Sequence, residues 1–162
     1  MSVEAMKTKM ITRAALVAAV YVVLTVVLAP ISYGPLQFRV SEMLKPLALF
    51  APWFAWAFAL GTGLANLWSP FGPWDYVAMP LVDALAAWIC WKLRAYPAPA
   101  LCVQAVIISV GVAVFPLWLG GKVAPWLTFL PVLAAQLVIL LGAWFIVWKP
   151  RREWVRWLFK GS

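Results

Sequence analysis

The sequence predicts an all-α membrane protein, a polytopic bundle of six transmembrane helices that forms one domain over residues 1–162. Composition leads to this prediction first, because 66% of the residues are hydrophobic and only 11% are charged. A soluble domain of this size could not bury so much apolar surface, whereas a lipid bilayer solvates it. Two further observations agree: apolar stretches near spanning length recur along the chain, and Lys and Arg are distributed unevenly around them.

Pro, Gly and charged residues divide the apolar sequence into six segments. We expect helices at residues 10–29, 42–52, 54–69, 75–93, 98–118 and 125–148. Between residues 11 and 29, the first segment is interrupted only by two Thr, one Arg and one Tyr. The second and third are short and meet at Ala51-Pro52-Trp53. A kinked pair of helices and one long broken helix both remain open for this region.

The last three segments are expected to form the wall of a pocket. Each contains a proline (Pro80, Pro116 and Pro131), which frees a backbone carbonyl that a cavity or a neighbouring helix must satisfy. Gln136 is the only strongly polar residue inside the sixth segment, and Gln104 is its counterpart in the fifth.

Residues 150–160 carry a basic repeat. Arg152, Arg156 and Lys160 recur every four residues, while Trp154 and Trp157 share another face with Leu158. This pattern is typical of a short interfacial helix on the cytoplasmic leaflet. A solvated basic tail is an equally good interpretation.

The distribution of cations predicts the orientation. With six spans and a cytoplasmic N-terminus, ten cations lie inside: Lys7, Lys9, Arg13, Lys92, Arg94, Lys149, Arg151, Arg152, Arg156 and Lys160. Three lie outside: Arg39, Lys45 and Lys122. The positive-inside rule therefore predicts that both termini are cytoplasmic. Contact with the anionic lipid headgroups of the bilayer accounts for the net charge of +8 without a nucleic-acid partner.

Residue types that catalysis requires are missing. The chain has no His, its two cysteines, Cys90 and Cys102, match no metal motif, and it has no phosphate-binding glycine loop. Zinc chemistry and nucleophiles activated by His are therefore excluded. We expect no enzymatic activity, no catalytic residue, no metal site and no cofactor.

Polar residues gather in the two loops expected at the outer face. Each loop contains an aromatic-Gly-Pro turn, at residues 33–35 and 71–73. The polar residues are Gln37, Arg39, Glu42, Asn66 and Asp75, and the aromatic residues are Tyr33, Phe71 and Trp74. Aromatic rings stack on a flat heterocycle, and carboxylates or amides bind its edge. The cluster predicts a small-molecule site, although Arg39 and Glu42 could instead pair with each other, i to i+3.

Asp83 is a further acidic residue in the membrane region. Asp75, Met79 and Asp83 follow one side of the fourth segment at four-residue intervals. Asp83 should lie about 12 Å deeper than Asp75, near the middle of the bilayer. A carboxylate at this depth is protonated or bound to a donor, which can belong to a ligand or to a neighbouring helix.

Small residues line one face of the first segment. Ala14, Ala15, Ala18 and Ala19 give a doubled four-residue spacing that lets another helix approach closely. The pattern fits docking to another subunit as well as packing within the bundle.

Two loop sequences resemble a known family. Residues 31–42, ISYGPLQFRVSE, and residues 65–75, ANLWSPFGPWD, are similar to the signature blocks of the queuosine-precursor transporter family, QueT. The resemblance extends from the first helix to Gln136, mainly through hydropathy in the later helices. Asp83 stands where a small or neutral residue is expected, so the resemblance does not support a role for it.

The resemblance implies a substrate-binding S-component of an energy-coupling factor (ECF) transporter, a six-helix protein in the plasma membrane of a prokaryote. Its cargo would be queuine or a related deazaguanine, held near the outer face under the loop after the first helix. Its partners would be a transmembrane coupling subunit, docked at Ala14 and Ala18, and two cytoplasmic ATPases. An S-component for another flat vitamin or base, and a ligand-free membrane scaffold or assembly protein, are the alternatives.

Overall fold

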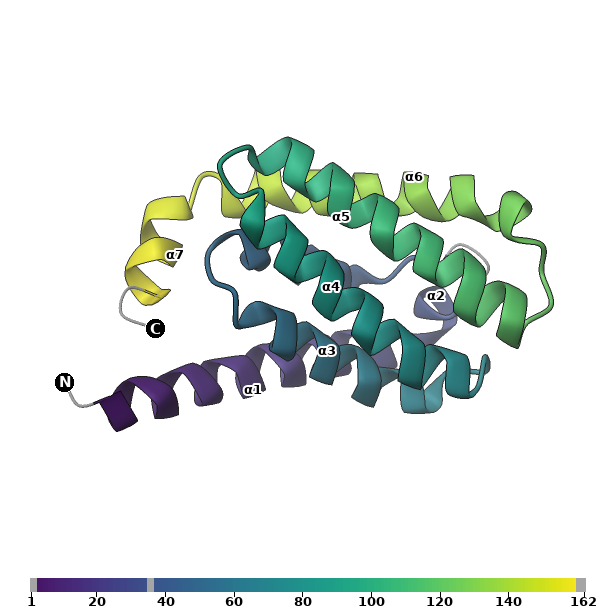
Figure 1. Ribbon diagram of the computed structural model, residues 1–162, viewed down its shortest axis with the longest axis horizontal. Helices are drawn as coiled ribbons and strands as arrows, with labels where there is room; N and C mark the ends of the chain where they lie inside the picture. The colour runs from purple at the N-terminus through teal and green to yellow at the C-terminus, as the bar shows by residue number, and fades with distance from the viewer. Residues whose placement is uncertain (1–2, 35–36, 160–162) are drawn as a thin grey trace.

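The computed structural model describes residues 3–34 and 37–159, and every regular element within them is a helix (Figure 1). The α-helices are α1 (Val3–Val27), α2 (Ala29–Ser32), α3 (Phe54–Ala65), α4 (Met79–Lys92), α5 (Pro97–Val112), α6 (Pro125–Ala143) and α7 (Arg152–Phe159). Two 3₁₀ helices are η1 (Val40–Leu49) and η2 (Asn66–Trp68), and three π-helical segments are η3 (Trp74–Ala78), η4 (Ala113–Gly120) and η5 (Trp144–Trp148). The predicted all-α class is confirmed for this part of the chain.

Within the described part of the chain, three helices are long and apolar enough to cross a membrane. They span Thr8–Val27, Pro97–Gly120 and Pro125–Trp148, and the last two consist of α5 with η4 and of α6 with η5. The three other segments expected from the sequence contain shorter helices: η1, then α3 with η2, then η3 with α4. The count of six spans therefore stays a prediction.

The second segment is a 3₁₀ helix rather than an α-helix. Pro46 lies inside η1 and has no N–H to donate, which weakens an α-helical hydrogen-bond ladder at this point. At about 2.0 Å per residue its ten residues rise roughly 20 Å, less than the ~30 Å of a hydrocarbon core. In 3₁₀ geometry, side chains at i and i+3 lie one above the other, which determines how Glu42 and Lys45 meet.

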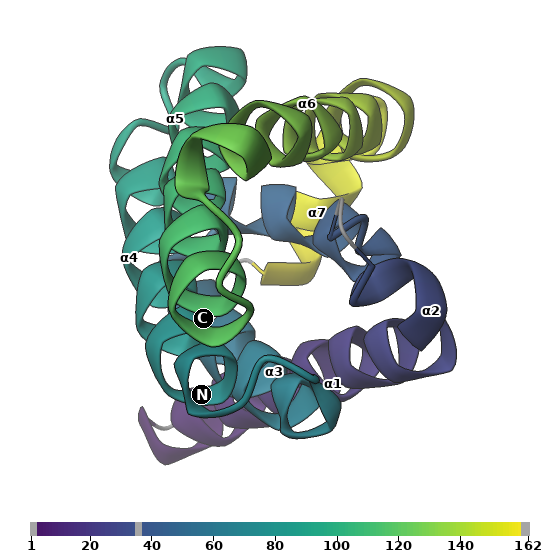
Figure 2. The same cartoon turned by 90° about the vertical axis from the view of Figure 1, so that its right-hand side faces the viewer.

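The helices form a closed ring. In order, α1 contacts α3, α3 contacts α4, α4 contacts α5 and α5 contacts α6, and η1 closes the ring between α6 and α1 (Figure 2). Because η1 also contacts α3 and α4, its side chains enter the interior of the bundle. This central position explains why a short helix between two longer ones contributes so many buried residues.

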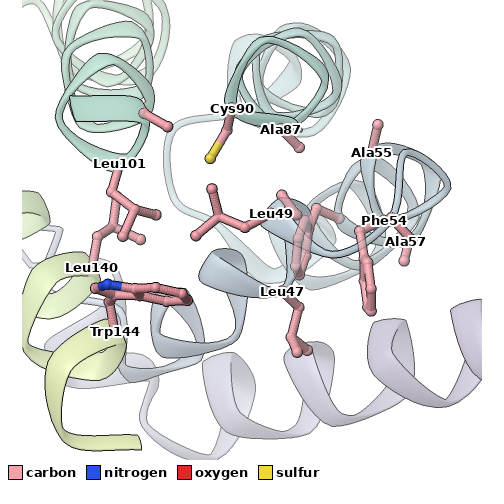
Figure 3. Close-up of a cluster of buried hydrophobic side chains, with 14 of the residues drawn as sticks. Leu47, Leu49, Phe54, Ala55, Ala57, Ala87, Cys90, Leu101, Leu140 and Trp144 are labelled. Carbon is pink, nitrogen blue, oxygen red and sulfur yellow. The ribbon is translucent and has the colours of Figure 1, made fainter. Parts of the chain in front are cut away.

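Two apolar clusters divide the interior. The larger one, which we call the lower cluster, joins Leu47 and Leu49 of η1 to Phe54, Leu101 and Leu140 of three other helices (Figure 3). The upper cluster comes from α4, α5, η4 and α6: Met79, Ala86, Ile108, Val112, Leu117 and Val132. The boundary between the two clusters is where buried polar side chains of α4, α5 and α6 occur.

The outer surface of the bundle is apolar. Trp56 is 76% exposed and Trp126 is 78% exposed, and α1 presents Leu16, Val23 and Val27 outward. Such continuous apolar surface is expected where lipid is the solvent. The start of α1 and the whole of α7 lie at the same end of the bundle, and α2 lies at the opposite end (Figure 1). We call these the α7 end and the α2 end.

Candidate functional site

Arg39 is the centre of a buried network at the α2 end. It is only 3% exposed, and it lies in an extended conformation immediately before η1. Its guanidinium donates from Nη1 to Asn66 Oδ1 (2.8 Å) and from Nη2 to Gln37 Oε1 (2.9 Å), and it pairs with Asp75 Oδ2 at 3.4 Å. Burial alone would lower the pKa of Arg39, but nearby acidic groups, Asp75 first among them, raise it, so the guanidinium stays charged.

Asp75 is the anionic half of this network. Asn66 Nδ2 donates to its Oδ1 and to its backbone oxygen, both at 2.9 Å, and the Ser69 hydroxyl donates to Oδ2. Gly72 suits the preceding turn, since its φ of 68° lies in the left-handed region, which glycine adopts without steric cost. We call Gln37, Arg39, Asn66, Ser69 and Asp75 the Arg39 network. Its carboxylate is fully compensated by donors of the protein.

Tyr33 covers the Arg39 network from the preceding turn. Its hydroxyl donates to the backbone oxygen of Ala65 at 2.5 Å, and its ring centroid lies 5.4 Å from the Arg39 Cζ, within cation–π distance. Partial burial raises the pKa of the Tyr33 hydroxyl, which keeps it protonated as a donor. These contacts tie the segment before η1 to the end of α3.

Phe71 and Trp74 lie elsewhere. Trp74 is exposed and its ring lies 6.5 Å from that of Phe115, while Phe71 packs against Gly120 and Gly121 and the upper cluster. Successive residues of a helical turn point about 100° apart, so Trp74 turns outward where Asp75 turns inward. The structure brings together Tyr33, Gln37, Arg39, Asn66 and Asp75 as the sequence predicts, but it directs these two rings to η4.

Glu42 belongs to a second network, deeper in the bundle. Its Oε2 lies 2.6 Å from Lys45 Nζ, and its Oε1 accepts a hydrogen bond from the Tyr21 hydroxyl at 2.5 Å. The i, i+3 overlap of a 3₁₀ helix places Glu42 and Lys45 one above the other. The alternative pairing of Arg39 with Glu42 is wrong, because Arg39 pairs with Asp75 and Glu42 pairs with Lys45.

Lys45 connects η1 to α3 and α4. It is 1% exposed, and its Nζ donates to Asp83 Oδ1 at 2.7 Å, while the Thr62 hydroxyl donates to Asp83 Oδ2. We call Tyr21, Glu42, Lys45, Thr62 and Asp83 the Lys45 network. Counting Lys45 among the outer cations is therefore wrong, since the residue is an internal counter-ion. Asp83 is bound to donors on neighbouring helices, one of the two arrangements expected for a carboxylate at its depth.

Gln104 and Gln136 lie on the boundary between the two apolar clusters. One turn on either side of Gln136 are Val132 of the upper cluster and Leu140 of the lower cluster. Gln104 lies in the same way between Leu101 and Ile108. Asp83 occupies this boundary on α4, one turn from Met79 and one turn from Ala87. Three consecutive helices thus present a polar side chain at one level of the interior.

Several buried polar atoms have no hydrogen-bond partner within the described residues. They are both amide atoms of Gln104, Oε1 of Gln136, Nε2 of Gln37, the hydroxyl of Ser32 and Oε2 of Glu42. Glu42 Oε2 is nevertheless compensated, because it forms the ion pair with Lys45 at 2.6 Å. A buried polar group left unpaired costs about 1–3 kcal/mol, so such groups call for an explanation. The sequence placed Gln37 in the outer cluster and both Gln104 and Gln136 in the expected pocket wall, because each of the latter two is a lone amide in an apolar helix.

Ala14 and Ala18 lie on the side of α1 that packs within the bundle. Ala18 is buried and Ala14 contacts the lower cluster, whereas Ala15 and Ala19 are exposed. On this side of α1 the helix α3 approaches closely at Gly61, where an added Cβ would lie 3.2 Å from Tyr21 of α1. Of these four alanines, only the exposed Ala15 and Ala19 are open to contact with another protein.

Comparison with known proteins identifies the family. The family model of the QueT transporter matches residues 11–150, from within α1 to the turn before α7. The chain belongs to the QueT transporter family. It is therefore a membrane protein of a transporter family, not of an enzyme family.

One curated relative supports the assignment over a shorter stretch. The queuosine precursor transporter QueT of Lactococcus lactis subsp. cremoris (strain MG1363) is 48% identical over 65 residues. These residues make up 39% of this chain and 38% of that protein. No solved structure matches the chain. The QueT family match covers both networks and both unpaired glutamines.

Proposed function

We propose that this QueT-family protein is the substrate-binding S-component of an ECF transporter that imports a queuosine precursor such as queuine or a related deazaguanine. The observation that carries the proposal is a set of unpartnered amide atoms, both of Gln104 and Oε1 of Gln136, at the level of the interior that Asp83 of the Lys45 network also occupies. A deazaguanine presents N–H donors and a carbonyl acceptor along one flat edge. Amides and carboxylates are the groups that bind such an edge.

Charge supports a cargo rich in donors. The five buried charged residues described here are Arg39, Glu42, Lys45, Asp75 and Asp83, two cations and three carboxylates. A base that donates N–H groups to Glu42 or Asp75 compensates this excess of negative charge. In this proposal Asn66, Gln37 and Gln136 are amide partners and Asp83 holds Lys45 in place.

The Arg39 network gives the proposal a gate. Tyr33 is joined to α3, and Arg39 is joined to η2 and η3 through Asn66 and Asp75. When these bonds break, Tyr33 and Arg39 can move away from the α2 end and expose Asp75 to the cargo. The base would then stack on Tyr33, Phe71 and Trp74 as it enters. This step requires the rings of Phe71 and Trp74, which pack against η4, to turn inward.

The membrane arrangement and partners follow from the same proposal. Six spans place the α7 end in the cytoplasm of a prokaryotic cell, where the cations near α7 meet anionic lipid. The coupling subunit, which carries two ATPases below it, would bind α1. Ala15 and Ala19 offer direct contact there, and Ala14 and Ala18 support that face from within.

Ligand-induced stabilisation tests the cargo. Purified protein is heated with queuine, other deazaguanines, guanine, riboflavin or thiamine. A ligand present at about 100 times its Kd should add about 2.7 kcal/mol to the free energy of unfolding. A response to riboflavin or thiamine alone would assign another flat cargo, and no response to any compound would favour the ligand-free scaffold. The Asp75 carboxylate, fully compensated by donors of the protein, is the observation on which that scaffold alternative rests.

The unpaired amides allow a sharper test. Gln104→Leu and Gln136→Leu each remove a polar group that has an unpaired atom in the structure without cargo. We expect these variants to be at least as stable as the wild type without cargo and to lose most deazaguanine binding. Ser109→Ala is the control on α5, the helix of Gln104, because the Ser109 hydroxyl already donates to Ala105 O at 2.7 Å. Unchanged binding in both Gln variants would contradict the proposal.

A further inference from the structure

The α7 end of the bundle carries a cavity whose lining includes no residue of the Arg39 or Lys45 network. It has a volume of about 470 Å³ and lies between the end of η1, the connection from α4 to α5, and α7. Phe50 and Trp144 form part of its apolar wall. Four cations line it: Lys92, Arg94, Arg152 and Arg156.

These four charges are not compensated by the described residues. No carboxylate lines the cavity, and the ion pairs found in residues 3–34 and 37–159 involve other side chains. Lys92 Nζ lies 5.1 Å from the Trp88 ring centroid, and Arg94 Cζ lies 4.4 Å from that of Trp91. The indoles thus restrain two cations without neutralising them.

Interactions within the helices explain the positions of only some of these four cations. Lys92 is in the last turn of α4, where a cation interacts favourably with the helix dipole, and Arg94 donates to Trp91 O at 3.0 Å. Arg152 and Arg156 are like charges four residues apart, an arrangement that destabilises an isolated helix. Val155, buried in the lower cluster, nevertheless anchors α7 so that both arginines line the cavity.

We propose that this cavity binds the phosphodiester group of an anionic membrane phospholipid. Guanidinium groups bind phosphate oxygens through directional, charge-assisted hydrogen bonds, and basic pockets between transmembrane helices bind anionic headgroups. The surrounding indoles of Trp88, Trp91 and Trp144 are typical of headgroup level, and the apolar wall suits the glycerol and first acyl carbons. A free phosphate ion shares the chemistry of the headgroup but gains nothing from that wall.

Native mass spectrometry of the purified protein tests the lipid site. The full chain in neutral micelles is titrated with phosphatidylglycerol or phosphatidylcholine, and inorganic phosphate is added in a third arm. At roughly fivefold per cation, removing two cations in Arg152→Gln/Arg156→Gln should weaken phosphatidylglycerol binding about 30-fold. Lys149→Gln/Arg151→Gln removes two charges from the adjoining turn but none from the cavity, and it should change binding less than about threefold by the same reasoning.

Two further variants make the result independent of any folding defect in α7. Lys92→Gln/Arg94→Gln should weaken binding as much as the α7 pair, and Arg152→Lys/Arg156→Lys, which keeps both charges but loses the guanidinium fork, should weaken it less than Arg152→Gln/Arg156→Gln does. Equal binding of the two lipids, or equal losses in the cavity and control variants, would overturn the proposal. Displacement of phosphatidylglycerol by inorganic phosphate at similar concentration would also overturn it and assign a free anion instead.

Discussion

The two buried networks are built from similar groups but on different parts of the chain. The Arg39 network joins loop residues at the α2 end, where Arg39 precedes η1 and Asp75 follows the turn at Gly72. The Lys45 network joins side chains within four helices, α1, η1, α3 and α4. A loop can leave its partners while the bundle stays folded, whereas helices of a closed ring cannot. The first network is therefore suited to a gate and the second to a framework.

Replacing Lys45 should have the largest effect. Lys45→Met leaves Glu42 and Asp83 buried without their cation, and removing one partner of a buried ion pair costs about 3–5 kcal/mol. We expect a strong loss of folded protein, measured by yield of monodisperse protein and thermal unfolding in detergent. Lys149→Met, which removes an exposed lysine, is the control. A triple variant that adds Glu42→Gln and Asp83→Leu should recover much of the loss, and a mild effect of Lys45→Met would break the comparison.

Replacing Arg39 should have a smaller and more local effect. In Arg39→Gln the Asp75 carboxylate keeps its bonds from Asn66 and Ser69, so we expect a cost of about 1.5–3 kcal/mol, typical of a hydrogen bond to a charged group. Hydrogen exchange should accelerate in residues 37–45 and stay slow in α3 and α4. Equal acceleration throughout the bundle would place Arg39 in the framework instead.

Composition predicted the helical class because so apolar a chain is solvated by lipid. In lipid the backbone must satisfy its own hydrogen bonds, which leaves few structures other than helices. Proximity of Gln37, Arg39, Asn66 and Asp75 was also predictable, since the expected topology puts both loops on the same face. The burial of Lys45 was not predictable, because the positive-inside rule considers only where a cation lies in the sequence and has no information about burial. The 3₁₀ geometry of η1 decided that pairing, and no local pattern distinguishes it from an α-helix.

Missed members of the Lys45 network have the same explanation. Tyr21 and Thr62 are residue types that a membrane helix tolerates anywhere, so their partnership with Glu42 and Asp83 depends on how α1 and α3 pack. Trp74 shows the opposite error, a residue that was predicted for the site but lies outside it. Trp74 precedes Asp75 in the sequence, but its ring points to Phe115. Both errors concern the direction of a side chain, which sequence spacing alone determines only within a regular helix.

Replacing Glu42 distinguishes cargo binding from framework. Glu42→Gln keeps an acceptor for the Tyr21 hydroxyl but removes the charge beside Lys45. If the carboxylate also binds the base edge, deazaguanine binding should weaken by about 1–3 kcal/mol, measured by calorimetry. Unchanged affinity together with lower stability would assign Glu42 to the framework alone. Asp75→Asn is the parallel change in the Arg39 network.

The smallest expected effects come from one hydroxyl in each network, and they compare the networks most directly. Thr62→Val and Ser69→Ala each remove a single donor to a buried carboxylate, with little change in volume. Each carboxylate keeps other donors, so each loss should be about 1 kcal/mol or less. Thr62→Val should lower the thermal unfolding temperature of the whole bundle, because Asp83 joins α4 to η1. Ser69→Ala should leave that temperature nearly unchanged and accelerate hydrogen exchange in the turn before η3, because the Arg39 network opens without unfolding the ring. The reverse pattern would mean that the loop network, not the helical one, holds the bundle together.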